Sequence, residues 1–293
     1  MAFSPVVFAA VLKAVEEELG PNLDWTFTEA GKRFEETFLQ LYPKLTHEGL
    51  AKYVATKTSR ETVKPINRFL KKKGFSIRLD EMDDPLGIAC AAVIDILVNW
   101  KSKGKKKKIK LKKSKNIVPG VQLEDVEYLS SPDHPRDIAQ LMTQSDVNVF
   151  VTEDFSDGFD SPFDLLTKIE SLNNTKALME DHNYSNAYLP MVDLSHEKKP
   201  KWLIGTTTQP PGEPTPFYIN KAKSQHILRL NEEGAKAKAA AAIEVLNLSW
   251  DGPLVPRKPY IINTPYLIWF ELDDMVLFCA RVDEDVMREP ASL

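Results

Sequence analysis

The sequence predicts an α+β fold in which helices and antiparallel strands are intermixed. Two apolar runs near the C-terminus, residues 266–272 and 275–282, flank Asp273 and Asp274, which is the pattern of a tight β-hairpin. The first third of the chain instead spaces its apolar residues at helical intervals. The chain has 293 residues, of which 43% are hydrophobic, so it can bury a core of ordinary size in one large mixed domain or in two.

Each predicted element follows from a local pattern. Helices are predicted where apolar residues recur every three to four positions, and strands where they alternate or form short runs between turn residues. The predicted helices cover residues 6–19, 28–42, 60–73 and 163–180, and a further helix is considered for residues 133–142. The predicted strands cover residues 88–98, 147–151, 187–194 and 226–231, and the hairpin follows them.

Composition argues against a membrane protein. No stretch reaches the roughly 18 to 20 apolar residues that a membrane helix needs, so no membrane association is expected. Residues 6–12 are apolar, but they have no basic leader and no small-residue cleavage site. They also run into Lys13 and a group of acids, as an amphipathic helix does. We interpret them as a core helix rather than a signal peptide.

Neither the cysteines nor the histidines indicate a catalytic or metal site. Cys90 and Cys279 each lie in an apolar, strand-like run, where a thiol packs as a small hydrophobic group, so both are expected to be buried and free. The five histidines have no spacing suited to a metal. The common nucleophile, metalloprotease, dinucleotide and phosphate-loop motifs are absent. We therefore expect no enzyme activity, no cofactor and no metal.

The most informative segment covers residues 231–249, together with the alternating stretch that leads into it. That stretch has His226, Leu228 and Leu230 on one face, as a half-buried strand does, and two acids and Gly234 then end it. In an extended chain, the alanines at 235, 237, 239 and 241 lie on one face. The lysines at 236 and 238 lie on the opposite face. Such a segment could enter between two strands without overpacking one face or burying ammonium groups on the other. The alternative is an Ala-rich helix, because Ala, Lys and Glu are good helix formers.

This segment also carries a resemblance to a known family. Asn-Glu-Glu-Gly before the alanines, followed after a loop by the predicted hairpin, is similar to the C-terminal third of a serpin. Further pieces occur in family order, namely Phe3-Ser4-Pro5, Ile66-Asn67-Arg68-Phe69, the apolar strand 88–99, Tyr188-Leu189-Pro190 and Asn263-Thr264-Pro265. The resemblance implies one serpin-like α+β domain over residues 1–293 with a reactive-centre loop at 235–262. It also implies a reduced N-terminal part, because little sequence lies between Pro5 and Ile66. Residues 99–104 depart from the family's pattern after the buried strand.

The resemblance implies a serine protease inhibitor that acts as bait. A protease cleaves the loop, and the N-terminal half of the loop then inserts between the strands at residues 88–99 and 216–232, which distorts the attached protease. The hinge that begins this insertion is expected to comprise Glu232, Glu233, Gly234, Ala235, Ala237, Ala239 and Ala241.

Family spacing locates the bait bond. The fourteenth residue after Gly234 is Leu248, so the candidate bond joins Leu248 to Ser249 and suits a serine-type protease with an apolar primary pocket. The rival is the bond between Arg257 and Lys258, which suits a protease with basic specificity. A glycosylation sequon begins one residue before Leu248, and a glycan there would obstruct protease docking.

Ten lysines among residues 101–115 form a Lys-rich segment. The whole chain carries −4 and this segment +10, which leaves −14 for the rest. The segment could bind a polyanion such as heparin or a nucleic acid, although the lack of Arg and of interleaved aromatic residues argues against base-specific reading. The alternative is a solvated edge strand or loop that lysines protect from pairing with neighbours. The expected polyanion-binding residues are Lys105, Lys106, Lys107, Lys108, Lys110, Lys112 and Lys113.

Two functions therefore remain open at this point. The first is inhibition of a target protease by a monomer, and the second is a non-inhibitory, serpin-like binding or regulatory protein that uses the Lys-rich segment. The resemblance implies an extracellular location, although no signal peptide is visible, and the Lys-rich segment gives a cytoplasmic or nuclear location as the alternative.

Overall fold

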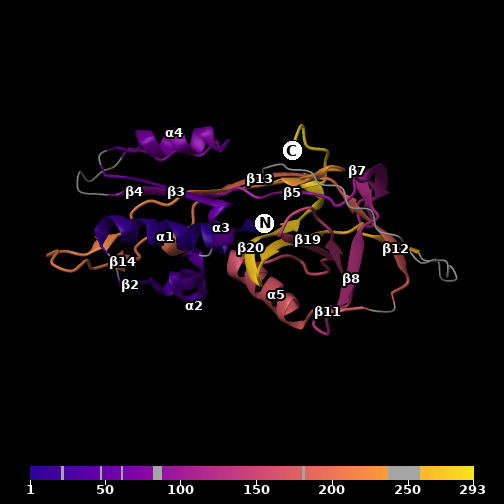
Figure 1. Cartoon of the computed structure of the whole chain (residues 1–293), viewed down its shortest axis with the longest axis horizontal. Coiled ribbons are helices and arrows are strands. Elements are labelled where there is room, and N and C mark those ends of the chain that lie inside the picture. Colours follow the sequence, from indigo (N-terminus) through magenta and orange to yellow (C-terminus); the bar gives the residue numbers. More distant parts are fainter. Residues whose placement is uncertain (21–22, 47, 61, 82–87, 180–181, 237–257) are drawn as a thin grey trace. The chain divides into compact units, whose positions relative to one another are not determined.

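The computed structural model describes residues 1–20, 23–46, 48–60, 62–81, 88–179, 182–236 and 258–293 (Figure 1). Its contacts divide the chain into two compact units. The helical unit comprises residues 4–95 and 195–226, and the sheet unit comprises residues 1–3, 96–194 and 227–293. A cluster of contacts is not by itself an independently folding domain, so the expectation of one domain stays a prediction.

The helical unit is built around α1 (Pro5–Leu19) and α2 (Lys32–Leu41). Proline suits the first turn of α1, where a backbone N–H has no intrahelical acceptor. An aromatic cluster joins the two helices to a more distant segment, because the ring of Phe8 lies 6.2 Å from that of Phe34 and 5.0 Å from that of Trp202. The helix predicted at residues 6–19 is confirmed.

A second small core of the helical unit forms on a strand pair. β3 (Val54–Ser59) pairs antiparallel with β4 (Ala89–Ile94) along its whole length, and α4 (Lys64–Lys72) packs on both strands. The Asn67 amide joins α4 to the next segment, since its Nδ2 donates to the Leu79 carbonyl oxygen (2.9 Å) and its Oδ1 accepts from the Leu79 N–H (2.8 Å). The sequence did not predict β3. The interval between Pro5 and Ile66, from which a reduced N-terminal part is expected, therefore contains a strand of six residues.

The sheet unit contains a seven-stranded sheet with α5 (Pro162–Thr175) packed on β20 (Figure 1). Every residue of β19 is buried, because a central strand covered on both faces carries a continuous apolar run. Asp273 and Asp274 join β19 to β20 with φ of 47° and 60°, a conformation that Asp tolerates in tight hairpins. The predicted hairpin is therefore confirmed. The strands follow the order β1 (Ala2–Phe3), β20 (Met275–Val282), β19 (Tyr266–Leu272), β10 (Asn148–Glu153), β9 (Ile138–Leu141), β8 (Val126–Ser130) and β11 (Ala177–Leu178).

Two four-stranded sheets carry the segments singled out from the sequence. In the first, β6 is an edge strand and β18 runs parallel to β12. Its order is β18 (Lys258–Ile261), β12 (Tyr184–Pro190), β7 (Ile117–Leu123) and β6 (Lys105–Lys110). In the second, the three-residue strand β17 lies between β16 and β5. Its order is β13 (Val192–Lys198), β16 (Ser224–Leu230), β17 (Gly234–Lys236) and β5 (Leu97–Asn99).

Several predicted boundaries were wrong. The helix considered for residues 133–142 is instead β9, which is paired on both sides by β8 and β10, so tertiary pairing overrides the local pattern. The helix predicted to reach residue 180 ends at Thr175, because Lys176 is extended with ψ of 134°. The single strand predicted at 187–194 is two strands, β12 and β13, and the long apolar strand is interrupted between β4 and β5.

Nine short elements complete the described structure. They are β2 (Trp25–Thr26), η1 (Glu29–Gly31), η2 (Tyr42–Thr46), α3 (Glu48–Ala51), η3 (Lys201–Leu203), β14 (Thr207–Thr208), β15 (Phe217–Tyr218) and η4 (Glu284–Val286), together with β1 in the order given above. None of the helices in the described ranges is long and apolar enough to span a membrane.

Candidate reactive-loop hinge

The strand β17 lies between β16 and β5 and pairs antiparallel with both. On one side, Ala235 faces Leu230, and on the other side it faces Val98. All three of these side chains are fully buried. Because partners across a sheet share a face, Ala235 belongs to the buried face of this sheet. The structure therefore places a three-residue strand between two others, at the position where the sequence predicts a hinge.

Gly234 is required at this position by the close approach of two strands. A β-carbon there would overlap the Val98 carbonyl oxygen and would lie 3.1 Å from the Asn99 Cα. Asn231 closes the turn that precedes β17, since its Oδ1 accepts from the N–H groups of Glu233 (2.8 Å) and Gly234 (3.3 Å). Asn-Glu-Glu-Gly thus forms a compact turn that redirects the chain from β16 into β17.

The backbone of this turn is anchored by the segment that follows β5. The Trp100 N–H donates to the Glu233 carbonyl oxygen (3.1 Å), and the Gly104 N–H donates to the Glu232 carbonyl oxygen (2.7 Å). The indole N–H of the buried Trp100 donates to the Asn231 carbonyl oxygen (2.9 Å). From the sequence, residues 99–104 are only a departure from the family pattern, and their role in holding the hinge was not predicted.

The two hinge acids form ion pairs with the start of the Lys-rich segment. Lys103 lies 3.1 Å from the Glu233 carboxylate, and Lys106 lies 3.3 Å from that of Glu232 and also pairs with Glu289. The pKa of the Lys106 ammonium is raised above its ordinary value, first by its hydrogen bond to Glu289 and then by that to Glu232. The sequence did contain a signal for this contact. The Lys-rich segment and the two hinge acids carry opposite charges, although they are far apart in the chain.

The Lys-rich segment forms the edge strand β6, as the structural alternative from the sequence predicts. Four of its six residues are exposed lysines in a row, whereas Ile109 is buried. Lys105 pairs with Glu124, and the Lys107 ammonium lies 5.8 Å from the centre of the Tyr188 ring. Within the described part of the chain, the remaining expected polyanion-binding residues have no acidic partner, and these are Lys108, Lys110, Lys112 and Lys113.

Most residues of the predicted bait bonds and three of the predicted hinge alanines lie outside the described residues. This is the case for Leu248, Ser249 and Arg257, and also for Ala237, Ala239 and Ala241. Lys258 is described, and it begins β18, where its N–H donates to the Asn183 carbonyl oxygen (2.9 Å). Of the hinge residues, Glu232, Glu233, Gly234 and Ala235 are brought together by the turn and β17.

The cysteines are both free thiols, as predicted. Cys279 is fully buried, and burial raises the pKa of its thiol above the ordinary value. Cys90 is less deeply placed than predicted, although burial is still the main cause that raises its pKa to about 12. In the ranges that the structure describes, no group of His, Cys, Asp and Glu could hold a metal ion.

No family model matches the sequence, and no curated protein matches it. Solved structures do match. Glycosylated human kallistatin is 14% identical, with a TM-score of 0.59, and the match covers 99% of this chain and 92% of that chain. A serpin from the trematode Schistosoma haematobium is 13% identical, with a TM-score of 0.53, and the match covers 96% of this chain and 99% of that chain. At such identities the likeness concerns the fold alone.

Proposed function

We propose that this chain, which has a serpin-like α+β fold, inhibits a serine-type protease by inserting its cleaved loop as a new strand between β16 and β5. The fold that the sequence predicts is confirmed by the similar solved structures. The inhibitory mechanism is our proposal, and one observation carries it: β17 already occupies the place between β16 and β5 in the uncleaved chain.

The register of β17 assigns a face to each later residue of the loop. Ala235 is on the buried face, so in a continued strand Ala237, Ala239 and Ala241 fall on that face as well. Lys236 pairs with Arg229 and Leu97, so the lysine after it at 238 falls on the opposite face. Alanine fits a buried face between two formed strands without displacing neighbours. A helical interpretation of the same alanines does not account for the strand that precedes them.

The structure of β18 supports the choice of Leu248 over Arg257 as the bait residue. Cleavage after Arg257 needs the backbone of Lys258 in the protease active site, but the Lys258 N–H is already hydrogen-bonded to Asn183. Leu248 is ten residues before the start of β18. In the proposed reaction the protease serine Oγ attacks the Leu248 carbonyl carbon and forms an ester. The bond to Ser249 breaks, and the released amine of Ser249 takes the proton from the protease histidine.

Capture of a chymotrypsin-like protease tests the proposed function. The chain, made without glycosylation because of the sequon at Asn247, is expected to form a complex with chymotrypsin that survives denaturing electrophoresis, because the ester stays intact in a distorted active site. Leu248→Arg is expected to lower the rate of chymotrypsin capture by on the order of a hundredfold and to create capture of trypsin, since the primary pocket sets specificity.

The matched control is Arg257→Leu, which makes the opposite exchange at the rival bond. This variant is expected to capture chymotrypsin at the wild-type rate. Clean cleavage of the wild-type chain without any stable complex would contradict inhibition. Faster chymotrypsin capture by the control than by the wild-type chain would contradict the assignment of Leu248.

A polyanion-binding function is the second candidate, because exposed lysines without an acidic partner among the described residues lie on the edge strand β6 and in the loop after it. Among the described residues, Lys108, Lys110 and Lys113 are exposed and have no acidic partner. Lys103, Lys105 and Lys106 instead pair with acids and must break those pairs before they can bind a sulfate group. The candidate therefore rests on the distal part of the Lys-rich segment.

Salt-dependent retention on heparin tests this second function. The triple variant Lys108→Gln, Lys110→Gln, Lys113→Gln is expected to bind heparin on the order of tenfold more weakly and to elute at lower salt, because each lost ammonium removes a screened contact. The variant Lys103→Gln, Lys105→Gln, Lys106→Gln has the same change in net charge and is expected to lose less. Equal losses in both variants would indicate attraction by net charge alone.

A further inference from the structure

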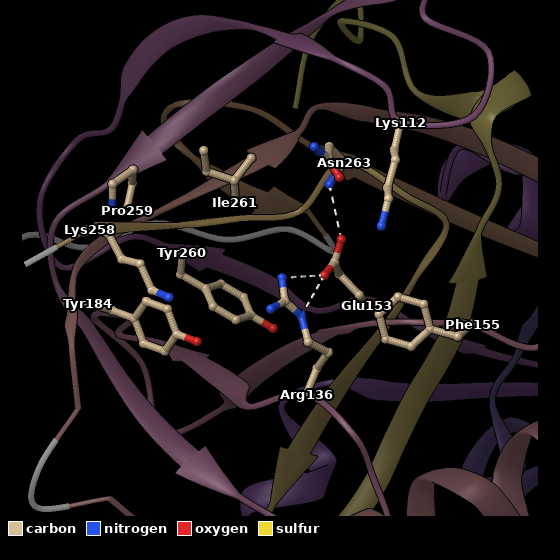
Figure 2. A pocket seen from close by; sticks show the side chains of 10 residues that line it. All are labelled: Lys112, Arg136, Glu153, Phe155, Tyr184, Lys258, Pro259, Tyr260, Ile261 and Asn263. Atoms are coloured by element: carbon tan, nitrogen blue, oxygen red, sulfur yellow. Dashed lines mark hydrogen bonds and ion pairs between the residues drawn. The ribbon is translucent and has the colours of Figure 1, made fainter.

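The sheet unit contains a pocket of about 580 Å³ that is separate from the hinge (Figure 2). It is bounded by the start of β12, the strand β18 and the end of β10, and the loop between β6 and β7 contributes Lys112. Its volume lies within the roughly 300–1,000 Å³ of sites that bind small molecules. The lining residues are Lys112, Arg136, Glu153, Phe155, Tyr184, Lys258, Pro259, Tyr260, Ile261 and Asn263.

The charges of this pocket do not balance. Arg136 and Glu153 neutralise each other, because the guanidinium Nε and Nη2 lie 2.8 and 2.7 Å from one carboxylate oxygen of the buried Glu153. Lys112 and Lys258 are the other charged groups, and neither ammonium has a carboxylate partner within the described ranges. Figure 2 shows the two lysine side chains on different sides of the pocket, with Tyr260 and Glu153 between them. Among the described residues, the pocket therefore presents two lysines without a carboxylate partner.

The walls between these lysines are aromatic and fixed in place. Tyr260 is buried, and its hydroxyl donates to the Asp137 carbonyl oxygen (2.6 Å). The Tyr184 hydroxyl donates to the Asp137 carboxylate (2.8 Å), and the two tyrosine rings meet edge to face at 5.2 Å. The Phe155 ring is 52% exposed at the rim, although it is a large apolar side chain. Rings held in this way lower the entropy cost of binding a planar group.

We propose that this pocket binds a small organic anion in which a carboxylate, sulfonate or phosphate is attached to an aromatic body. The positive charges of Lys112 and Lys258 attract the anionic group from two sides of the pocket, and the aromatic body lies against the tyrosine wall and Phe155. A bare inorganic anion leaves the apolar walls uncovered, and a neutral aromatic compound leaves both ammonium groups without a counterion. The proposal does not depend on protease inhibition, because the pocket contains neither a hinge residue nor the proposed bait residue Leu248.

A pair of fluorescent probes tests the proposal. The anion 1-anilinonaphthalene-8-sulfonate is expected to bind with a dissociation constant in the micromolar range, whereas its uncharged analogue N-phenyl-1-naphthylamine is expected to bind at least tenfold more weakly. Lys112→Gln and Lys258→Gln are each expected to weaken binding of the anion about tenfold. Lys101→Gln is the matched control, because it removes the same charge from an exposed residue that neither lines the pocket nor belongs to the expected polyanion-binding residues.

Two further measurements separate this site from unspecific binding of the probe. Phe155→Ala is expected to weaken binding of the anion several-fold without changing the melting temperature, since that ring is half exposed. Phenyl phosphate is expected to displace the anionic probe, and inorganic phosphate at the same concentration is not. The proposal is wrong if the lysine variants bind the anion as the control does, or if the uncharged analogue binds as tightly as the anion.

Discussion

Cleavage of the loop in the free protein is expected to raise the melting temperature by roughly 20 °C. An inserted strand of about twelve residues adds on the order of ten hydrogen bonds, each contributing ~1 kcal/mol net. For a chain of this size, each kcal/mol shifts the melting temperature by about 2 °C. Insertion has a defined starting point, because β17 is already paired on both sides. The measurement is calorimetry before and after limited digestion with thermolysin, a zinc protease that forms no acyl-enzyme.

A pair of loop variants shows whether the rise comes from insertion. Ala239→Glu adds a carboxylate on the face that Ala235 shares with buried residues, so the nicked variant is expected to lose most of the rise. Ala240→Glu adds the same charge one residue later, on the opposite face of the proposed strand. This variant is expected to keep the rise in melting temperature after nicking. An unchanged melting temperature after complete nicking of the wild-type chain would show that the loop does not insert. Equal behaviour of the two variants would exclude a strand.

Elements with a strong local pattern could be predicted from the sequence. The hairpin of β19 and β20 was predicted with its bounds, because two apolar runs flank a pair of Asp residues that tolerate positive φ. The alternating burial of β16 was also predicted, and the buried face carries His226, Leu228 and Leu230. In these segments, the positions that are apolar in the sequence pattern are also the positions that the fold buries, so the local pattern was sufficient.

Features set by long-range pairing could not be predicted in this way. β9 became a strand through pairing with β8 and β10, although its own residues allow a helix. The anchoring of the hinge by Trp100 and Gly104 depends on two chain segments about 130 residues apart. No local pattern specifies which residues meet across such a distance. The pocket beside β18 is of the same kind, because its lysines come from loops and strands that are far apart in the sequence.

Gly234→Val is expected to destabilise the uncleaved protein and to disable inhibition. The new β-carbon overlaps the Val98 carbonyl oxygen, so β17 and β5 must separate. Overpacking of this kind costs about 1–3 kcal/mol, which corresponds to a melting temperature lowered by roughly 2–6 °C. The larger effect is kinetic. Insertion that begins without a paired β17 is slower, so the protease has time to hydrolyse the ester.

The kinetic effect has a direct readout in the products of the reaction with chymotrypsin. A barrier to insertion raised by about 1.4 kcal/mol slows it roughly tenfold, so most of the variant is expected to end as cleaved chain with active protease released. The matched control is Glu233→Val, which places the same side chain one residue earlier at an exposed position and loses only the surface ion pair to Lys103. The control is expected to keep the wild-type yield of complex. Full inhibition by the glycine variant would mean that the close contact of Gly234 with Val98 plays no part in starting insertion.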